Sequence, residues 1–217
     1  MEPYLYALIS TFVPEHSKYL TFLAGGKLVK EEREGCTYAN GVLHSFDDKP
    51  AEIRYGTQLW YKNGKIHRDD DKPAEIGDNG EQYWYQNGEY HRDGDKPAII
   101  EEDGTQMWYK NGKQHRDGDL PAVIRSAGKS PSQEWYKNGK VHRDGDLPAV
   151  IWSNGQKVWF KNGELHRDGD LPAVIYADGS QCWYKNGELH RDGDNPAVIG
   201  IDGTKKWYKN GIRYYPA

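Results

Sequence analysis

The chain has 217 residues, of which 36% are hydrophobic and 29% are charged, and its net charge is −4. This balance does not support nucleic acid as a specific partner, because phosphate binding needs a clustered cationic surface. No run approaches the ~18 apolar residues of a membrane span, and the 13% of aromatic residues is far above the content of disordered chains. We therefore predict an ordered protein without a transmembrane segment.

Residues 1–35 differ from the rest of the chain, and we expect them to form an N-terminal cap. The segments "PYLYALISTFV" and "EHSKYLTFLA" predict a cap that is partly helical. Glu2 stands where a signal peptide carries basic residues, so we expect a protein that is not secreted. Two cysteines, Cys36 and Cys182, do not make a disulfide scaffold and favour a reducing, cytoplasmic compartment.

From residue 36 onward the sequence repeats itself, which predicts one repeat domain over residues 36–217. The block opens with Trp and an aromatic residue and continues to Asn-Gly, with successive spacings of 24, 24, 27, 24, 24 and 24 residues. An eroded copy starts at Cys36. The 27-residue step holds an insertion at residues 126–132, and residues 207–217 form a C-terminal cap.

Two turn signals in each repeat predict hairpins. Asn-Gly follows the aromatic pair, as at Asn138-Gly139, and a second Gly lies about half a period later, as at Gly155. Asn-Gly tolerates the positive φ angles of two-residue hairpin turns. A Gly or Pro every six to ten residues argues against helices. The predicted fold is all-β, an elongated antiparallel array of seven to eight hairpin units.

Alternation along each strand leaves the buried face undecided. One face of the "CWYK" strand carries Cys182 and Tyr184, and the other carries Trp183 flanked by Gln181 and Lys185. On the return arm, Ile and the Ala two residues earlier share a face. Because neither face is polar, we expect the sheet to curl and enclose one aromatic row.

The triplet His-Arg-Asp occurs six times, although it also marks the catalytic loop of protein kinases. Kinase chemistry needs an Asn five residues after the Asp, but Ala stands there in every copy, as at Ala149. We therefore interpret His142, Arg143, Asp144 and Asp146, and their equivalents, as a structural bend. In it Asp accepts backbone N–H bonds, and Arg bridges carboxylates of the same or the adjacent repeat.

A metal site in each repeat is an alternative for the same residues. In an extended segment His142, Asp144 and Asp146 share a face and form a partial ligand set. Equivalent histidines of neighbouring repeats would lie roughly 10 Å apart, too far to share an ion. We predict no metal and no other cofactor.

The candidate interaction surface is a ladder of Trp and Lys side chains, which could bind protein, anionic lipid or single-stranded nucleic acid. Its members are Trp60, Trp84, Trp108, Trp135, Trp159, Trp183, Trp207, Lys62, Lys110, Lys137, Lys161 and Lys185. At the end of the chain, Tyr214 and Tyr215 stand where His and Arg usually stand. They are interpreted as a cap or as an aromatic dimer contact.

The repeat resembles a known family. The motif "G-x-x-x-W-Y-x-N-G-x-x-H", present from Gly179 to His190, is similar to MORN repeats and especially to their variant form. The extension "H-R-D-x-D-x-P-A-x-I" looks like repeat proteins that large DNA viruses of amoebae, such as marseilleviruses, encode in many copies. The resemblance covers residues 36–217 and implies an elongated hairpin array, self-association through repeat faces or ends, and a scaffold role.

These observations predict a non-enzymatic repeat protein that serves as a protein-interaction scaffold or as a structural component of a virus or virion. Its protein partner is unknown, and a homodimer is expected. The alternative function is binding of acidic lipid or polyanions through the Lys and Trp ladder.

Overall fold

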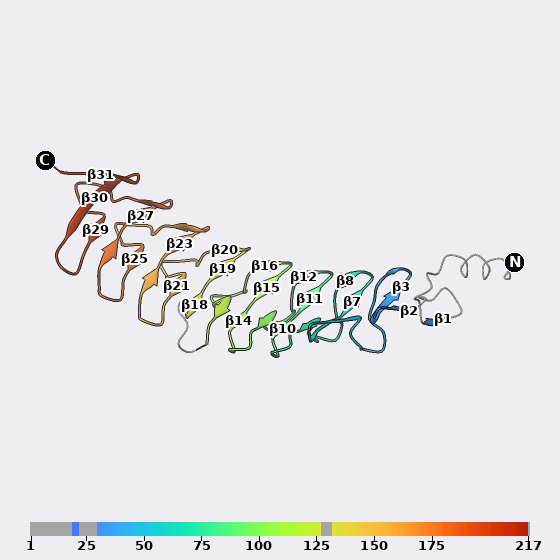
Figure 1. Ribbon diagram of the computed structural model, residues 1–217. Coiled ribbons are helices and arrows are strands. Elements are labelled where there is room, and N and C mark those ends of the chain that lie inside the picture. Colours follow the sequence, from blue (N-terminus) through green and yellow to red (C-terminus); the bar gives the residue numbers. More distant parts are fainter. Residues whose placement is uncertain (1–18, 22–29, 127–131, 217) are drawn as a thin grey trace. The chain divides into compact units, whose positions relative to one another are not determined.

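The computed structural model describes residues 19–21, 30–126 and 132–216. The regular elements of these residues are all β-strands, which confirms the predicted all-β class (Figure 1). The chain divides into two compact units, Met1–Glu89 and Tyr90–Ala217, and each is described by itself. The helix expected within residues 1–35 lies outside the described residues.

The first unit begins with a small antiparallel sheet of four strands. In order they are β1 (Tyr19–Thr21), β2 (Lys30–Arg33), β3 (Cys36–Ala39) and β4 (Val42–Leu43). The two central strands pair over their whole length, with Lys30 opposite Ala39 and Arg33 opposite Cys36. The eroded copy that starts at Cys36 therefore pairs with residues of the predicted cap.

A long sheet of fifteen strands is built from the repeats, and its strands follow one another as antiparallel neighbours. In the first unit these are β5 (Glu52–Arg54), β6 (Thr57–Leu59), β9 (Glu75–Ile76) and β10 (Gln82–Tyr83). In the second they are β13 (Ile99–Ile100), β14 (Gln106–Met107), β17 (Val123–Ile124), β18 (Gln133–Glu134), β21 (Val150–Ile151), β22 (Lys157–Val158), β25 (Val174–Ile175), β26 (Gln181–Cys182), β29 (Val198–Ile199), β30 (Lys205–Lys209) and β31 (Ile212–Tyr214). The predicted antiparallel hairpin array with a 24-residue period is confirmed.

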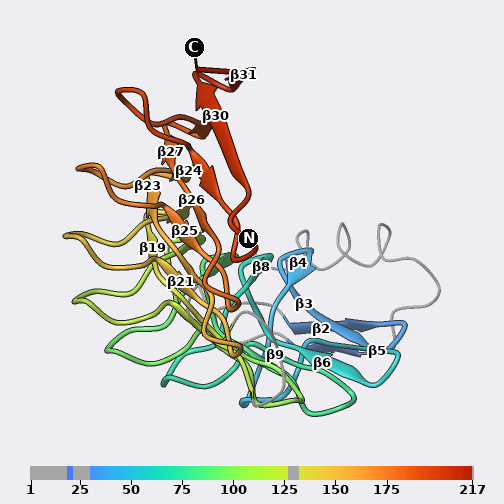
Figure 2. The same ribbon diagram turned by 90° about the vertical axis from the view of Figure 1, so that its left-hand side faces the viewer.

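Each repeat also carries a second, smaller hairpin outside the long sheet, so it contributes four strands. These side hairpins are β7 (Tyr61–Lys62) with β8 (Lys65–Ile66), β11 (Tyr85–Gln86) with β12 (Glu89–Tyr90), β15 (Tyr109–Lys110) with β16 (Lys113–Gln114), β19 (Tyr136–Lys137) with β20 (Lys140–Val141), β23 (Phe160–Lys161) with β24 (Glu164–Leu165), and β27 (Tyr184–Lys185) with β28 (Glu188–Leu189). In the second unit they project in a row from one side of the long sheet (Figure 2).

The Asn-Gly turns of the side hairpins have the predicted chemistry. Asn138 and Gly139 both have positive φ, at 53° and 82°. This pair of angles belongs to the two-residue turn whose twist matches antiparallel strands. Gly139 N–H also donates to Gln114 O of the preceding side hairpin over 2.8 Å, so the turn joins neighbouring repeats.

The strand expected to run through each Trp is broken there. Trp135 N–H donates to Ala149 O over 2.8 Å, and Trp135 O accepts the His142 N–H over 3.0 Å. Both bonds close the base of the side hairpin and its following bend. Glu134 therefore belongs to the long sheet and Tyr136 to the side hairpin. Sequence alternation missed the break because it depends on bonds to residues seven and fourteen positions away.

The core of the second unit lies between the long sheet and the side hairpins. On the sheet side it contains Val150, Val158, Val174 and Cys182. Side-hairpin residues pack against this cluster, namely Val141, Phe160, Leu165, Tyr184 and Leu189. The side hairpins therefore cover the sheet strands, and the sheet need not enclose one aromatic row by itself.

The structure decides which residues of the return arm are buried, a point that strand alternation left open. Ala149 and Val150 are both buried, whereas Ile151 is only half-buried. Ala149 stands just before β21, in the corner where the bend enters the sheet, so strand alternation does not apply to it. The small side chain is needed there because the corner is fully enclosed.

Candidate interaction surface

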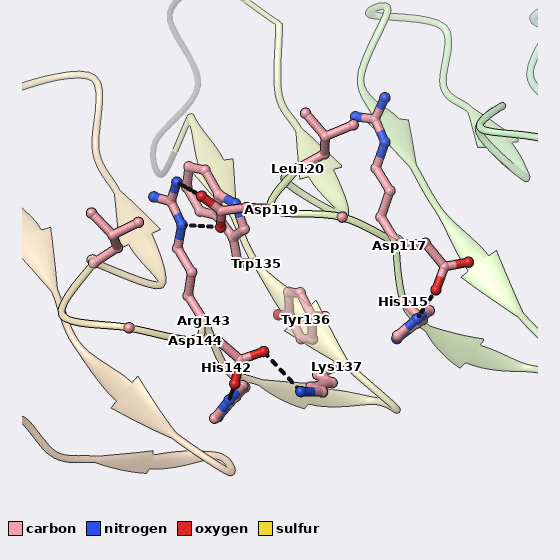
Figure 3. Close-up of a pocket in the computed structure, with 14 residues that line it drawn as sticks. His115, Asp117, Asp119, Leu120, Trp135, Tyr136, Lys137, His142, Arg143 and Asp144 are labelled. Atoms are coloured by element: carbon pink, nitrogen blue, oxygen red, sulfur yellow. Dashed lines mark hydrogen bonds and ion pairs between the residues drawn. The ribbon is translucent and has the colours of Figure 1, made fainter.

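A groove lies between consecutive repeats of the second unit (Figure 3). It has a volume of about 530 Å³ and is lined by residues 115–120 of one bend and by residues 135–137, 142–145 and 147 of the next repeat. An equivalent groove of about 340 Å³ lies between the repeats of Trp159 and Trp183. The groove is thus a product of the repeat and not of one unusual loop.

Arg143 lines this groove and clamps two repeats together. Its Nε and Nη2 donate to Asp119 of the preceding repeat over 2.6 and 2.7 Å, and its Nη1 donates to Pro148 O over 3.2 Å. The guanidinium lies 3.9 Å from the centre of the Trp135 ring. One planar side chain therefore combines a bidentate ion pair, a backbone hydrogen bond and a cation–π contact.

The same clamp recurs along the chain. The bidentate pairs of the second unit are Arg116–Asp95, Arg143–Asp119, Arg167–Asp146 and Arg191–Asp170, and in the first unit Arg68 pairs with Asp48 through Nε. Their guanidinium-to-ring distances are 3.8–3.9 Å. The predicted bridging of an adjacent repeat's carboxylate by Arg is present in all of them.

The histidine of the bend makes a second link between repeats. His115 Nδ1 accepts the backbone N–H of Asn138, in the turn of the next repeat, over 3.2 Å. Its Nε2 contacts Asp117 Oδ1 at 3.0 Å. A ring nitrogen that accepts an N–H cannot carry a proton, so this geometry assigns the neutral tautomer with the proton on Nε2.

Lysine completes the polar arrangement on the outer rim of the groove. Lys137 Nζ contacts Asp144 Oδ2 at 2.8 Å, and His142 Nε2 contacts Asp144 Oδ1 at 3.0 Å. These bonds, that of Lys137 first, lower the pKa of Asp144 to about 2. Hydrogen bonds from Arg143 likewise lower the pKa of Asp119. The carboxylates are therefore ionised and paired at neutral pH.

The structure separates the two parts of the predicted ladder. Six of its tryptophans are buried, with exposed fractions of 4–6%, and Trp207 is half-buried. Lys62, Lys110, Lys137, Lys161 and Lys185 have about half of their side chains exposed, and each contacts an Asp of its own repeat. A molecule that entered the groove would meet lysine, aspartate and leucine side chains, because the indole rings are buried against arginine.

The proposed partial metal ligand set does not come together. His142 contacts Asp144, but the Asp146 carboxylate is held by Arg167 of the next repeat at 2.6 and 2.8 Å. Among the described residues, no cluster of three or more His, Cys, Asp or Glu side chains is arranged to hold a metal ion.

At the C-terminal end, Tyr214 and Tyr215 follow a strand that differs from its equivalents. β30 runs through Trp207 without a break and pairs with β31. Tyr214 is half-buried, and its hydroxyl lies 3.5 Å from Gly193 O, while Tyr215 is 76% exposed.

One feature of the groove was missed in the sequence. Leu120, Leu147 and Leu171 follow the second Asp of three consecutive bends, and all three are exposed, by 43–45%. Leu120 and Leu147 line the same groove. Other repeats carry Lys72, Lys96 or Asn195 at this position, so the repeat does not require an apolar side chain there. The three leucines could therefore have been recognised in the sequence as a departure from the repeat.

Compared with models of protein families, with curated proteins and with solved structures, the chain matches none of them. Over the part of the chain that the structure describes, there is no helix with the length and hydropathy to cross a membrane. The site must therefore be interpreted from its own geometry.

Proposed function

We propose that this chain is a non-enzymatic repeat protein that acts as a protein-interaction scaffold or structural component. The observation that carries the proposal is the use of the His-Arg-Asp motif. In consecutive repeats its side chains hold one repeat to the next at nearly constant distances, as in Arg143–Asp119 and Arg167–Asp146. The His, Arg and Asp side chains, which resemble a catalytic motif in the sequence, are thereby used to hold the repeats in a regular array.

The resemblance to variant MORN repeats supports a finer proposal. We place the protein among the repeat proteins of large DNA viruses of amoebae, in the host cytoplasm or the virion. Quantitative mass spectrometry of purified virions tests this placement. A constant copy number per virion would support it, and recovery of the chain only in the secreted fraction would contradict it.

Binding of acidic lipid or polyanions is the competing function, and the half-exposed lysines favour it. Each of these lysines is, however, partnered by an aspartate, as Lys137 is by Asp144. In each such repeat one Lys and one Arg face two Asp, so the field over the groove is close to neutral.

Retention on vesicles and on oligonucleotides distinguishes the two functions. The probes are phosphatidylserine-containing vesicles and single-stranded homopolymer DNA, each at low and high salt. The scaffold proposal expects no retention at either salt concentration. Retention that disappears at high salt and is abolished by replacing the five lysines with Gln would overturn it.

A further inference from the structure

The exposed leucines form a short apolar row on the second unit. Leu120, Leu147 and Leu171 occupy the same position in three consecutive repeats, and each has more than two fifths of its surface in contact with solvent. The row is bounded by Lys96 on one side and Asn195 on the other. Scattered exposed leucines are ordinary, but repetition at one structural position places these three in a row.

The leucines are not required by the fold. Lysine and asparagine occupy the same position in repeats with the same bend. Arg191 still donates to Asp170, although Asn195 stands at the leucine position of its own repeat. The groove beside Leu171 has no second leucine in its lining, but it is formed by the same types of residue as the groove beside Leu120 and Leu147. An apolar side chain that is exposed, repeated and dispensable for folding indicates a surface that another molecule covers.

We propose that this leucine row is the contact through which two copies of the chain associate face to face. The inference rests on the proposed scaffold function and assigns its self-association to a particular surface. A two-fold axis that lays the row upon itself brings Leu147 opposite Leu147 of the other copy. Such an interface is isologous, because both copies use the same patch.

Charge favours a second copy over other occupants. Next to the row, each repeat presents a half-exposed Lys and a largely exposed Asp, such as Lys137 at 50% and Asp144 at 75%. In a second copy of this surface, lysines can face aspartates and aspartates can face lysines. A strongly anionic or cationic partner gains little from a surface that is neutral overall.

The length of the row suits a dimer contact. Two repeat steps separate Leu120 from Leu171, and two strands per step about 4.8 Å apart make the row roughly 20 Å long. A standard interface buries about 800 Å² per partner, which is a patch somewhat wider than the row is long. The leucines would lie at its centre and the Lys and Asp side chains at its polar rim.

Light scattering coupled to size-exclusion chromatography of the full chain tests the proposal. We expect a dimer in the native protein and a monomer in the combined variant Leu120→Lys, Leu147→Lys and Leu171→Asn, whose new residues already occupy this position in other repeats. The dissociation constant should rise roughly a hundredfold or more. An unchanged circular dichroism spectrum would show that the variant folds.

Two control variants locate the contact. Ile201→Asn removes an exposed apolar side chain of the same unit outside the row, and Tyr215→Ser removes the exposed aromatic residue at the chain end. Both should remain dimeric. A monomeric native protein, or a dimer that Tyr215→Ser dissociates and the leucine variant does not, would overturn the proposal. Neither result would affect the vesicle and oligonucleotide test of the scaffold function.

Cross-linking tests the symmetry directly. In a Cys36→Ser background, Leu147→Cys should form an intermolecular disulfide under mild oxidation, because each Leu147 faces its own copy. Leu120→Cys should cross-link either with itself, if the rows run parallel, or with Leu171→Cys, if they run antiparallel. Absence of cross-linking at position 147 in a dimeric sample would contradict an interface centred on the row.

Discussion

At the scale of single residues, the arginine of the bend accounts for much of the order in the array. Its side chain is only 12–15% exposed in the five clamps, yet all partners of its guanidinium are polar or aromatic. Burial of a charge is tolerated because each clamp supplies a carboxylate, a backbone carbonyl and the face of an indole. Lysine cannot reproduce this set, since it has no planar fork.

Replacing Arg143 by lysine should therefore destabilise the fold although the charge is kept. The loss of the fork and of the stacked contact should lower the free energy of unfolding by about 1–2 kcal/mol. Urea unfolding followed by circular dichroism measures the change. Arg213→Lys is the matched control, because Arg213 is exposed and outside the clamps, and its effect should stay below about 0.5 kcal/mol. Equal effects would contradict the assigned role.

Acid should weaken the array through its aspartates. The pKa of Asp144 and of Asp168 is about 2 in the folded protein, below the ordinary 3.8, mainly because of Lys137 and Lys161 respectively. Between these values the unfolded chain binds more protons than the folded chain, so stability rises with pH. The contribution is complete above about pH 3.8 and is lost as the pH falls to about 2.

The thermal midpoint of the native protein should accordingly drop between pH 4 and pH 2. In Asp144→Asn the midpoint should be lower than native at pH 6, and the difference should close by pH 2. A difference that stays constant over this range would show that the ionised carboxylate is not the stabilising form.

At the scale of elements, the side hairpins are held to one another as well as to the sheet. The link is formed by His115 Nδ1 and the Asn138 N–H, and it recurs between His142 and Asn162 at 3.0 Å. Since each histidine serves the turn of the next repeat, loss of one acceptor should act on one joint only.

His115→Phe should change amide hydrogen exchange at only one joint between repeats. The Asn138 amide should exchange roughly tenfold faster, because it loses its acceptor, whereas the Asn162 amide should be unchanged. Hydrogen exchange followed by NMR measures both sites in one sample. Faster exchange at both would indicate that the joints are coupled.

The sequence allowed the turns, the antiparallel pairing and the 24-residue period to be predicted, because Asn138-Gly139 and its equivalents act locally through positive φ. It did not allow the break at Trp135 to be predicted, since that depends on Ala149 O. The stacking of Arg143 on Trp135 was missed for the same reason, although the Arg–Asp bridges were anticipated. The leucine row could not be predicted from the repeat pattern, because it lies at a position where the repeats differ from one another.

At the scale of the whole molecule, stability should be nearly a sum over repeats and the joints between them. Removal of Tyr184–Trp207, a segment of 24 residues, should leave a cooperatively folded protein with a lower unfolding free energy. The deletion joins Trp183 to Tyr208 and preserves the alternation of strand direction, because it removes a whole period.

A deletion of half a period should behave differently. Removal of residues 194–205 eliminates β29, so β26 and the remaining part of β30 would run in the same direction and could not keep their antiparallel neighbours. Circular dichroism and urea unfolding should show lost cooperativity in this variant only. Equal stability of the two deletions would contradict a fold built from 24-residue periods.

The clamp between repeats also has a genetic consequence. Because Arg167–Asp146 and Arg191–Asp170 are interchangeable joints, unequal recombination between two such copies in the gene inserts or removes 24 codons and produces a new junction with the same contacts. Such events would change the number of repeats, and each product would still be able to fold. They would also move the leucine row relative to the chain ends. The order of Lys, Leu and Asn after the second Asp of each bend would then record which repeats were duplicated or lost.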